Sequence, residues 1–241
     1  MKAMILAAGA GTRLRPHTDL VPKPMLPVGG RPTLEWIVRW LARHGVGDIV
    51  INLHHRPEPV LAHFGDGERF GVRMTYSIEE TLLGTAGGLK RVGHLFDEAF
   101  VVVYGDVLTD LDLTALAAFH RAQDGGPHVT LSLYEASNPW ECGVIALDAR
   151  QRVVRFVEKP PRSQVFSSLV SAGVLVMDPG ILRHVPEAPS DLGRDVLPAL
   201  LQSAVAVYGQ PITRGAYLVD MGTPENYARA QREWPTPSAA A

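Results

Sequence analysis

The sequence has one cysteine, Cys142, so no disulfide can form within the chain. No apolar run approaches the roughly 18 residues that a membrane-spanning helix needs. The apolar stretch at the start is too short for a secretory signal before Gly9, Gly11 and Arg13 interrupt it. We therefore expect a cytoplasmic protein with no membrane partner.

A large excess of charge of either sign is missing as well. The 23 Lys and Arg residues nearly balance the 25 Asp and Glu residues, which leaves a net charge of −2. Such a chain has no broad cationic field to attract nucleic acid or anionic lipid. Lysine is scarce, because Lys2, Lys23, Lys90 and Lys159 are the only ones. Lys23 and Lys159 directly precede a proline, and a general preference for arginine does not explain that placement.

Hydrophobic residues, in contrast, are plentiful: they make up 46% of the 241 residues, enough to form the core of one large domain. In the first half, short apolar runs alternate with helical patterns, which is typical of a mainly parallel sheet with crossover helices. Thr33 is a candidate N-cap for the first helix and Gly45 a candidate stop. Strands are predicted over residues 2–7, 48–53, 72–77 and 100–104, and helices over residues 34–44, 60–64, 86–95 and 114–121.

The second half is richer in strands joined by short polar loops, which indicates a smaller, partly antiparallel layer. We expect a Rossmann-like α/β fold with one domain over residues 1–233, halves at about 1–125 and 126–233, and a frayed tail over 234–241. The cleft between the halves is the expected ligand site. Strands are predicted over residues 128–134, 143–147, 153–158 and 169–177, a strand pair around 204–208 and 216–220, and helices over 194–202 and 224–232.

A glycine-rich loop follows the first predicted strand. Gly9 and Gly11 let the backbone turn tightly and present N–H groups to an anion, and Thr12 and Arg13 add a hydroxyl and a guanidinium. The loop lacks the Gly-Lys-Ser/Thr ending of a Walker loop, and Leu14 stands where the dinucleotide fingerprint has its third glycine. A phosphate-binding loop of another kind is expected, although a turn with solvated arginines would also fit the pattern.

Lys23 follows in a proline-rich segment, Val21-Pro22-Lys23-Pro24-Met25-Leu26-Pro27. The prolines restrict the backbone and hold the segment extended, so Lys23 is a candidate fixed charge for phosphate.

Together, Gly-Ala-Gly-Thr-Arg-Leu-Arg-Pro over residues 9–16 and Pro-Lys-Pro-Met-Leu-Pro over residues 22–27 resemble the N-terminal motif of the sugar-1-phosphate nucleotidylyltransferases. Those enzymes join a nucleoside triphosphate and a sugar 1-phosphate into a nucleotide sugar and release pyrophosphate. The resemblance extends over about residues 2–230 and implies a nucleotide-binding first half and a sugar-binding second half. A monomer or homodimer is expected. The nucleotide-binding residues it implies are Leu6, Ala7, Ala8, Gly9, Gly11, Thr12, Arg13, Lys23, Glu79, Gly84 and Thr85.

Glu79 and Gly84 lie in a stretch that resembles the family's base-reading loop. A carboxylate can accept from the adjacent N–H donors of guanine, and glycine allows close approach to the ring. Thymidylyl and uridylyl members tend to carry an amide at the position of Glu79, so the pattern is more similar to guanylyltransferases. The alternative is that Glu79 is a surface carboxylate at a strand end.

Two aspartates match the family's metal-binding positions. Asp106 follows the predicted strand 100–104, and Asp220 ends the strand-like segment before Met221-Gly222-Thr223. Mg²⁺ prefers one or two carboxylates together with phosphate oxygens and water, so Mg²⁺ is the expected cofactor. Either aspartate by itself could instead cap a helix.

The sugar phosphate is expected in the second half. Glu158 and Lys159 resemble the family's sugar-phosphate motif, with Lys159 on the phosphate and Glu158 on sugar hydroxyls. Gly143 and Gly173 match glycines of the sugar pocket, and Arg194 is a candidate second cation or a surface charge.

The resulting hypothesis is a Mg²⁺-dependent guanylyltransferase with Arg13, Lys23, Asp106 and Lys159 as catalytic residues. Its substrates are expected to be GTP and mannose 1-phosphate or a heptose 1-phosphate. Transfer of a thymidylyl, uridylyl or cytidylyl group to another sugar 1-phosphate remains an alternative, as does an inert homologue that senses nucleotide sugars. We expect no C-terminal β-helix, since no hexapeptide repeat is present.

Overall fold

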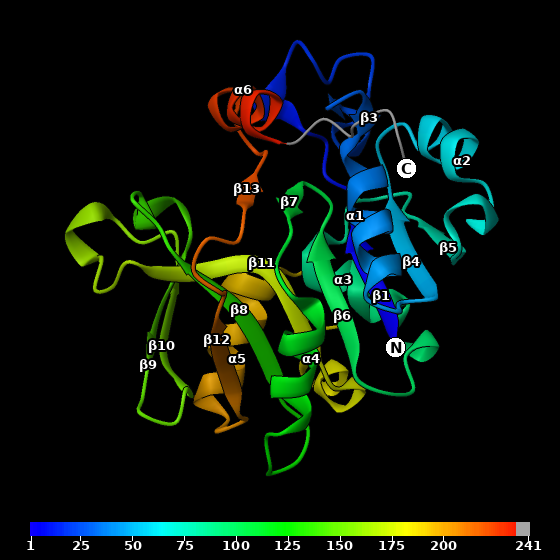
Figure 1. The fold of residues 1–241 in the computed structure, drawn as a ribbon. Helices are drawn as coiled ribbons and strands as arrows, with labels where there is room; N and C mark the ends of the chain where they lie inside the picture. Colours follow the sequence, from blue (N-terminus) through cyan, green and yellow to red (C-terminus); the bar gives the residue numbers. More distant parts are fainter. Residues whose placement is uncertain (235–241) are drawn as a thin grey trace.

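The computed structural model describes residues 1–234, and a sheet of nine strands runs through both halves (Figure 1). Its central order is β10-β9-β11-β6-β1-β4-β5, and β8 and β12 extend it from β11. The strands of this sheet are β1 (Lys2–Leu6), β4 (Asp48–Leu53), β5 (Arg73–Ile78), β6 (Phe100–Tyr104), β8 (Val129–Glu135), β9 (Gly143–Leu147), β10 (Val153–Glu158), β11 (Leu169–Met177) and β12 (Val207–Pro211). The helices are α1 (Thr33–Arg43), α2 (Glu58–Phe64), α3 (Gly84–Arg91), α4 (Leu113–Arg121), α5 (Leu197–Gln202) and α6 (Pro224–Glu233).

The first half forms the parallel part of this sheet. β1 pairs with β4 and β6, and β4 pairs with β5, all in parallel. Alternate side chains of these strands point to opposite faces, because the side-chain period of a strand is two residues. Ile5 packs in one core cluster with α1, α2 and α4, whereas Met4 packs in another with α3 and α5. The predicted mainly parallel α/β sheet with helices on both faces is confirmed.

The second half adds antiparallel strands to the same sheet. β11 runs antiparallel to β6, β8 and β9, and β9 pairs with β10. The pairing of β11 with β8 shifts between Ser171 and Leu175, where Gly173 has a φ of 74°. Glycine readily adopts this positive φ, and the irregular pairing bends β11 where the strand passes the end of β6. The predicted partly antiparallel layer is therefore continuous with the parallel sheet.

The expected pairing of segments 204–208 and 216–220 is wrong. β12 pairs in parallel with β8, because its apolar residues Val207 and Tyr208 complete the core beside that strand. The later segment forms β13 (Leu218–Asp220), which pairs antiparallel with the short strand β7 (Val107–Thr109). A further small hairpin, β2 (Pro27–Val28) with β3 (Arg31–Pro32), was not expected. Strands of two or three residues carry too little periodicity to be recognised.

Several helix ends differ from the prediction. Thr33 is the first residue of α1 rather than its N-cap, and its hydroxyl donates to the Leu26 carbonyl oxygen over 2.8 Å. Gly45 has a φ of 78° just beyond the end of α1, as a helix stop requires. α5 is preceded by a π-helical turn over Leu192–Val196. Trp234, expected in the frayed tail, is buried against Trp36 and Tyr217, and the rest of that tail lies outside the described residues.

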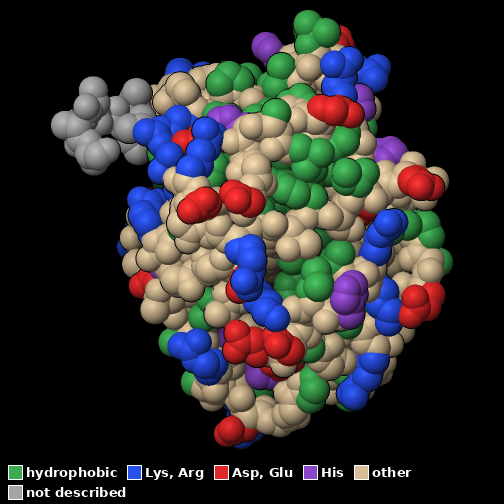
Figure 2. Space-filling view, turned by 90° about the vertical axis from the view of Figure 1, so that its right-hand side faces the viewer, with side chains coloured by type: hydrophobic (Ala, Val, Ile, Leu, Met, Phe, Trp, Pro, Cys, Tyr) green, Lys and Arg blue, Asp and Glu red, His purple; other side chains and the backbone are tan. Residues whose placement is uncertain are grey.

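Acidic and basic side chains are interspersed on the face shown in Figure 2, and neither sign gathers into a broad patch there. Among the described residues, no helix combines the length and the apolar character that crossing a bilayer would require.

Candidate active site

A cavity of about 290 Å³ opens at the carboxyl ends of β1, β4 and β6. This is the edge at which parallel α/β sheets bind ligands. Seven of the eleven residues expected at the nucleotide line it, whereas Gly11, Thr12, Arg13 and Glu79 do not. Its lining residues are Leu6, Ala7, Ala8, Gly9, Lys23, Pro24, Asn52, Leu82, Gly84, Thr85, Tyr104, Gly105 and Asp106.

The glycine-rich loop packs against the segment that carries Lys23. Gly11 has a φ of 65°, and its carbonyl oxygen accepts the Thr18 hydroxyl over 2.9 Å. A Cβ on Gly11 would stand 3.0 Å from the Cβ of Lys23, so the two loops are in close contact. Leu14 is fully buried and anchors the far end of the loop, while Thr12 and Arg13 are exposed.

Lys23 and Asp106 form an ion pair at one wall of the cavity. Both side chains are mostly enclosed, with exposed fractions of 13% and 20%. Burial by itself would raise the pKa of Asp106, but the charge and hydrogen bond of Lys23, together with the charge of Arg13, lower it overall. Asp106 is therefore held as a carboxylate at neutral pH.

Asp220 is brought to the same place by the pairing of β13 with β7. The Met221 N–H donates to the Asp106 carbonyl oxygen over 2.9 Å, which joins the segments carrying the two aspartates. A Cβ on Gly222 would stand 2.9 Å from Asp220 Oδ1 and 3.1 Å from Arg13 Nη2, so glycine leaves room for the guanidinium beside the carboxylate. The structure thus brings Arg13, Lys23, Asp106 and Asp220 together, as the resemblance implies.

The donor set fits a divalent cation. Loss of solvation and the charge of Asp106 raise the pKa of Asp220 to about 6, although Lys23 and Arg13 oppose this. Two carboxylates that repel each other beside a cavity are suitable ligands for Mg²⁺, because the ion relieves the repulsion.

Glu79 lies behind the cavity wall rather than in it. Glu79 is only 2% exposed. Its Oε1 accepts a hydrogen bond from Asn52 Nδ2 over 2.8 Å, and its Oε2 accepts one from the Leu83 N–H over 3.0 Å. Asn52 Oδ1 in turn accepts the Ala7 N–H over 2.8 Å. Glu79 and Asn52 therefore connect the ends of β1, β4 and β5 and hold the chain that leads to Gly84.

The start of α3 contacts the second half of the chain directly. The Thr85 hydroxyl donates to Asp191 Oδ2 over 2.8 Å and accepts the Leu192 N–H over 2.8 Å. Gly84 has a φ of 75°, and a Cβ there would stand 2.3 Å from the Ser190 carbonyl oxygen. Only glycine fits this close approach, which joins the cavity to the turn over residues 190–193.

A second polar group forms around Glu158 in the second half. Its Oε2 lies between Gly143 and Gly193, where added Cβ atoms would stand 2.9 Å and 2.7 Å away. Burial raises the pKa of Glu158, with a further contribution from Asp191, although Lys159 opposes both.

Lys159 follows Glu158 with a φ of 47°, and its side chain is 55% exposed. Its N–H donates to the Cys142 carbonyl oxygen over 3.0 Å, which fixes the backbone there. Gly173 packs against Val107 and Tyr104 near the end of β6, and Arg194 is exposed.

Sequence reasoning missed Pro24, Asn52, Leu82, Tyr104 and Gly105 in the cavity wall. Asn52 and Tyr104 lie at or next to the ends of predicted strands, so their position at the carboxyl edge was the available signal. Asp191 carried no comparable signal, because its contact with Thr85 spans 106 positions of sequence.

Comparison with known proteins gives a consistent result. Residues 2–236 match the family described as nucleotidyl transferase. The chain is 35% identical to the UTP–glucose-1-phosphate uridylyltransferase of Synechocystis over 96% of its length and 63% of the relative's. It is 36% identical to the mannose-1-phosphate guanylyltransferase of Mycobacterium tuberculosis over 96% of its length and 64% of the relative's.

A solved structure from Bacillus anthracis, of a protein provisionally named a glucose-1-phosphate thymidylyltransferase, superposes with a TM-score of 0.86 at 25% identity, covering 96% of this chain and 94% of that one. The chain spans less than two thirds of the length of the curated relatives it matches. The family match covers almost the whole chain, and the identities to these relatives exceed 30%. Both findings confirm the family resemblance seen in the motifs of the sequence. The chain belongs to the nucleotidyl transferase family.

Proposed function

We propose that this chain transfers a nucleoside monophosphate from a nucleoside triphosphate to a sugar 1-phosphate, giving a nucleotide sugar and pyrophosphate. The observation that carries the proposal is the convergence of Lys23, Arg13, Asp106 and Asp220 at the rim of one cavity. Two cations and two carboxylates at the end of a glycine-rich loop suit a triphosphate and its counter-ion.

In the proposed reaction, an oxygen of the sugar phosphate attacks the α-phosphorus in line. The new P–O bond forms as the bond to the pyrophosphate leaving group breaks. This phosphate is already anionic near neutral pH, so no strong general base is required. Catalysis then consists of positioning and of stabilising negative charge.

The residues of the site have separate roles in this proposal. The backbone N–H groups of Gly9 and Gly11 and the guanidinium of Arg13 hold the triphosphate. Lys23 exchanges Asp106 for a phosphate oxygen as the nucleotide enters. Lys159 binds the sugar phosphate, and Glu158 accepts hydrogen bonds from sugar hydroxyls between Gly143 and Gly193.

Asp106 and Asp220 would hold Mg²⁺ in this scheme. When bound, the ion supplies positive charge that offsets the charge of the triphosphate and of the departing pyrophosphate. Asp106 is already ionised, and Asp220, with its raised pKa, gains from an added cation.

For the base we propose guanine, with mannose 1-phosphate or a heptose 1-phosphate as acceptor. Support comes from the several curated relatives named mannose-1-phosphate guanylyltransferases or guanyltransferases. Uridylyl transfer to glucose 1-phosphate is the second candidate, because one relative of similar identity carries that name. Gly84 and the apolar side chain of Leu82 form the part of the cavity suited to a planar base. We propose that the enzyme acts in the cytoplasm, as these substrates suggest.

The test is pyrophosphate release with Mg²⁺, measured for GTP, UTP, dTTP, CTP and ATP against mannose, glucose and heptose 1-phosphates. We expect the highest kcat/KM for GTP with mannose or heptose 1-phosphate. Release only with UTP and glucose 1-phosphate would select the second candidate. No release with any pair, from protein shown to be folded, would contradict the transferase proposal and favour the inert sensing homologue.

A further inference from the structure

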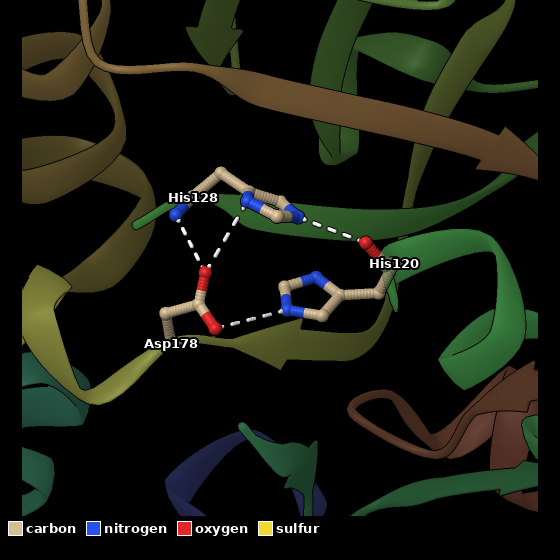
Figure 3. A group of neighbouring side chains, drawn as sticks. All are labelled: His120, His128 and Asp178. Atoms are coloured by element: carbon tan, nitrogen blue, oxygen red, sulfur yellow. Dashed lines mark hydrogen bonds and ion pairs between the residues drawn. The ribbon is translucent and has the colours of Figure 1, made fainter. Parts of the chain in front are cut away.

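Two buried histidines and a partly exposed aspartate meet at the edge of the sheet opposite the cavity (Figure 3). His120 lies in the last turn of α4, His128 directly precedes β8, and Asp178 directly follows β11. Met177, beside Asp178, pairs with Phe100 at the start of β6, whereas the cavity lies at the end of β6. The group is therefore separate from Asp106 and Asp220.

These side chains have the composition and spacing of a metal site. One ligand atom from each lies within 4.8 Å of the others, and among residues 1–234 no other group of three or more His, Cys, Asp or Glu does so. His120 is 2% exposed and His128 5% exposed, so neither belongs to a solvated surface cluster. Two imidazoles and one carboxylate select a first-row transition metal over Mg²⁺ or Ca²⁺.

The distances within the group are compatible with a shared ion. His120 Nε2 lies 3.4 Å from Asp178 Oδ1, and His128 Nδ1 lies 3.2 Å from Asp178 Oδ2. A charge-assisted N–H···O bond is normally about 2.7–2.9 Å. Ligand atoms that surround zinc tetrahedrally at about 2.0–2.1 Å are about 3.3 Å apart. The His–Asp separations match the second value.

Each of the three side chains is also held by a further contact, with Thr130 or with backbone of the group's own residues. His120 Nδ1 lies 2.9 Å from Thr130 Oγ1, and His128 Nε2 lies 3.0 Å from the His120 carbonyl oxygen. Asp178 Oδ2 accepts the His128 N–H over 2.8 Å. Contacts of this kind on the far ring nitrogen fix the tautomer and direct the near nitrogen to a metal.

One contact competes with the ion. His128 Nδ1 also lies 2.9 Å from the Gly126 carbonyl oxygen. An ion at this nitrogen would require that carbonyl oxygen to move away. Gly126 is exposed, so its carbonyl oxygen can turn to water at little cost.

We propose that His120, His128 and Asp178 bind one zinc-like divalent transition-metal ion that serves the fold. The Asp178 side chain is 25% exposed and leaves room for a water molecule as fourth ligand. The ion would tie the end of α4, the start of β8 and the end of β11 together across the exposed loop over residues 122–127. The proposal does not depend on the transferase reaction.

The test uses the full chain with Asp106→Asn and Asp220→Asn, so that the proposed catalytic ligands do not bind the added ion. After treatment with a chelator, the protein is titrated with Co²⁺, whose visible spectrum reports nitrogen ligands, and with Zn²⁺. We expect one ion per chain and a higher unfolding temperature with Zn²⁺. His128→Gln should abolish binding, and Thr130→Val should weaken it by about ten- to a hundredfold.

His94→Gln serves as the matched control, because His94 is exposed and lies outside the group. It should leave the stoichiometry and the affinity unchanged. Absence of binding in the parent, equal binding by the His128→Gln variant, or equal loss in the control would each overturn the proposal. Should His128→Gln not fold, the ¹⁵N signals of the His128 ring decide: Zn²⁺ is expected to shift them, and unchanged signals would overturn the proposal.

Discussion

Asn52 Nδ2 donates to Glu79 Oε1 over 2.8 Å, and this contact joins the ends of β4 and β5 at the wall of the cavity. Asn52 also accepts the Ala7 N–H, while Glu79 also accepts the Leu83 N–H. A chain of hydrogen bonds thus runs from the glycine-rich loop to the backbone before Gly84. Glu79 lies behind the cavity wall and holds Asn52, which is part of that wall.

Glu79→Gln should impair every nucleotide to a similar degree. Both carboxylate oxygens of Glu79 accept an N–H, and an amide would direct its NH₂ group at one of those donors. We expect kcat/KM to fall by about tenfold, which corresponds to about 1.4 kcal/mol, for GTP and UTP alike. Glu80→Gln, at the exposed neighbouring position, should be silent. A change in the ratio of GTP to UTP would show instead that Glu79 contacts the base.

Asp106→Asn should lower turnover by several orders of magnitude. The amide lacks the charge of a metal ligand and leaves Lys23 without its anionic partner. The measurement is pyrophosphate release with Mg²⁺, accompanied by thermal unfolding. Asp124→Asn, at an exposed position, is the matched control. Near-normal release from the Asp106→Asn variant would refute its metal role.

Lys23→Arg and Lys159→Arg should each cost activity, whereas Lys90→Arg should be nearly silent. A planar guanidinium does not replace a compact ammonium at a phosphate or in the enclosed contact between Lys23 and Asp106. Lys90 bonds the Leu182 carbonyl oxygen and pairs with exposed Glu187, where arginine serves equally well. We expect losses of about tenfold or more in kcat/KM for the first two variants. The substrate whose KM rises identifies the phosphate each lysine contacts.

Gly84→Ala should destabilise the protein far more than Gly45→Ala. Both glycines have positive φ, but a Cβ on Gly84 would overlap the Ser190 carbonyl oxygen, whereas a Cβ on Gly45 meets nothing within 4 Å. Gly45→Ala isolates the conformational cost, a loss of about 1 kcal/mol in the free energy of unfolding. Gly84→Ala adds a backbone clash, for a total loss of about 3 kcal/mol or more. Urea unfolding measures both values. Equal losses would show that the contact with Ser190 relaxes without cost.

Glu35, a buried residue of α1 whose carboxylate contacts Arg31, Arg39 and His63, should stabilise the protein at neutral pH and lose that effect in acid. Burial alone would raise the pKa of Glu35, but hydrogen bonds from Arg39 and His63, and the charge of Arg39, lower it below its ordinary value of 4.5. A lowered pKa stabilises the folded state above the ordinary value, and the effect disappears as pH falls through the folded value.

Glu35→Gln should therefore reduce the free energy of unfolding by about 2 kcal/mol near neutral pH, and the difference from wild type should shrink in acid. Urea unfolding over a series of pH values measures this, with exposed Glu68→Gln as the control. A difference independent of pH would contradict the assignment.

The parallel half was predictable because its strands are buried on both faces and its helices are strongly periodic. The buried run Phe100-Val101-Val102-Val103 illustrates such a strand, and Gly45, with its positive φ, marks the end of the first helix. β7 and β13 were not predictable as a pair, because three residues carry no period and their pairing spans about a hundred positions. Their pairing is nevertheless what brings Asp220 beside Asp106.

The sequence by itself determined which functional groups follow the parallel strands: a glycine-rich loop, a lysine and an aspartate. Local backbone preference and hydrophobic period suffice for that. Only the tertiary structure decided that Glu79 bonds Asn52, that Glu158 lies between Gly143 and Gly193, and that His120, His128 and Asp178 meet. These are contacts across many positions, and packing of the whole sheet selects them, because no local pattern specifies which side chains become neighbours.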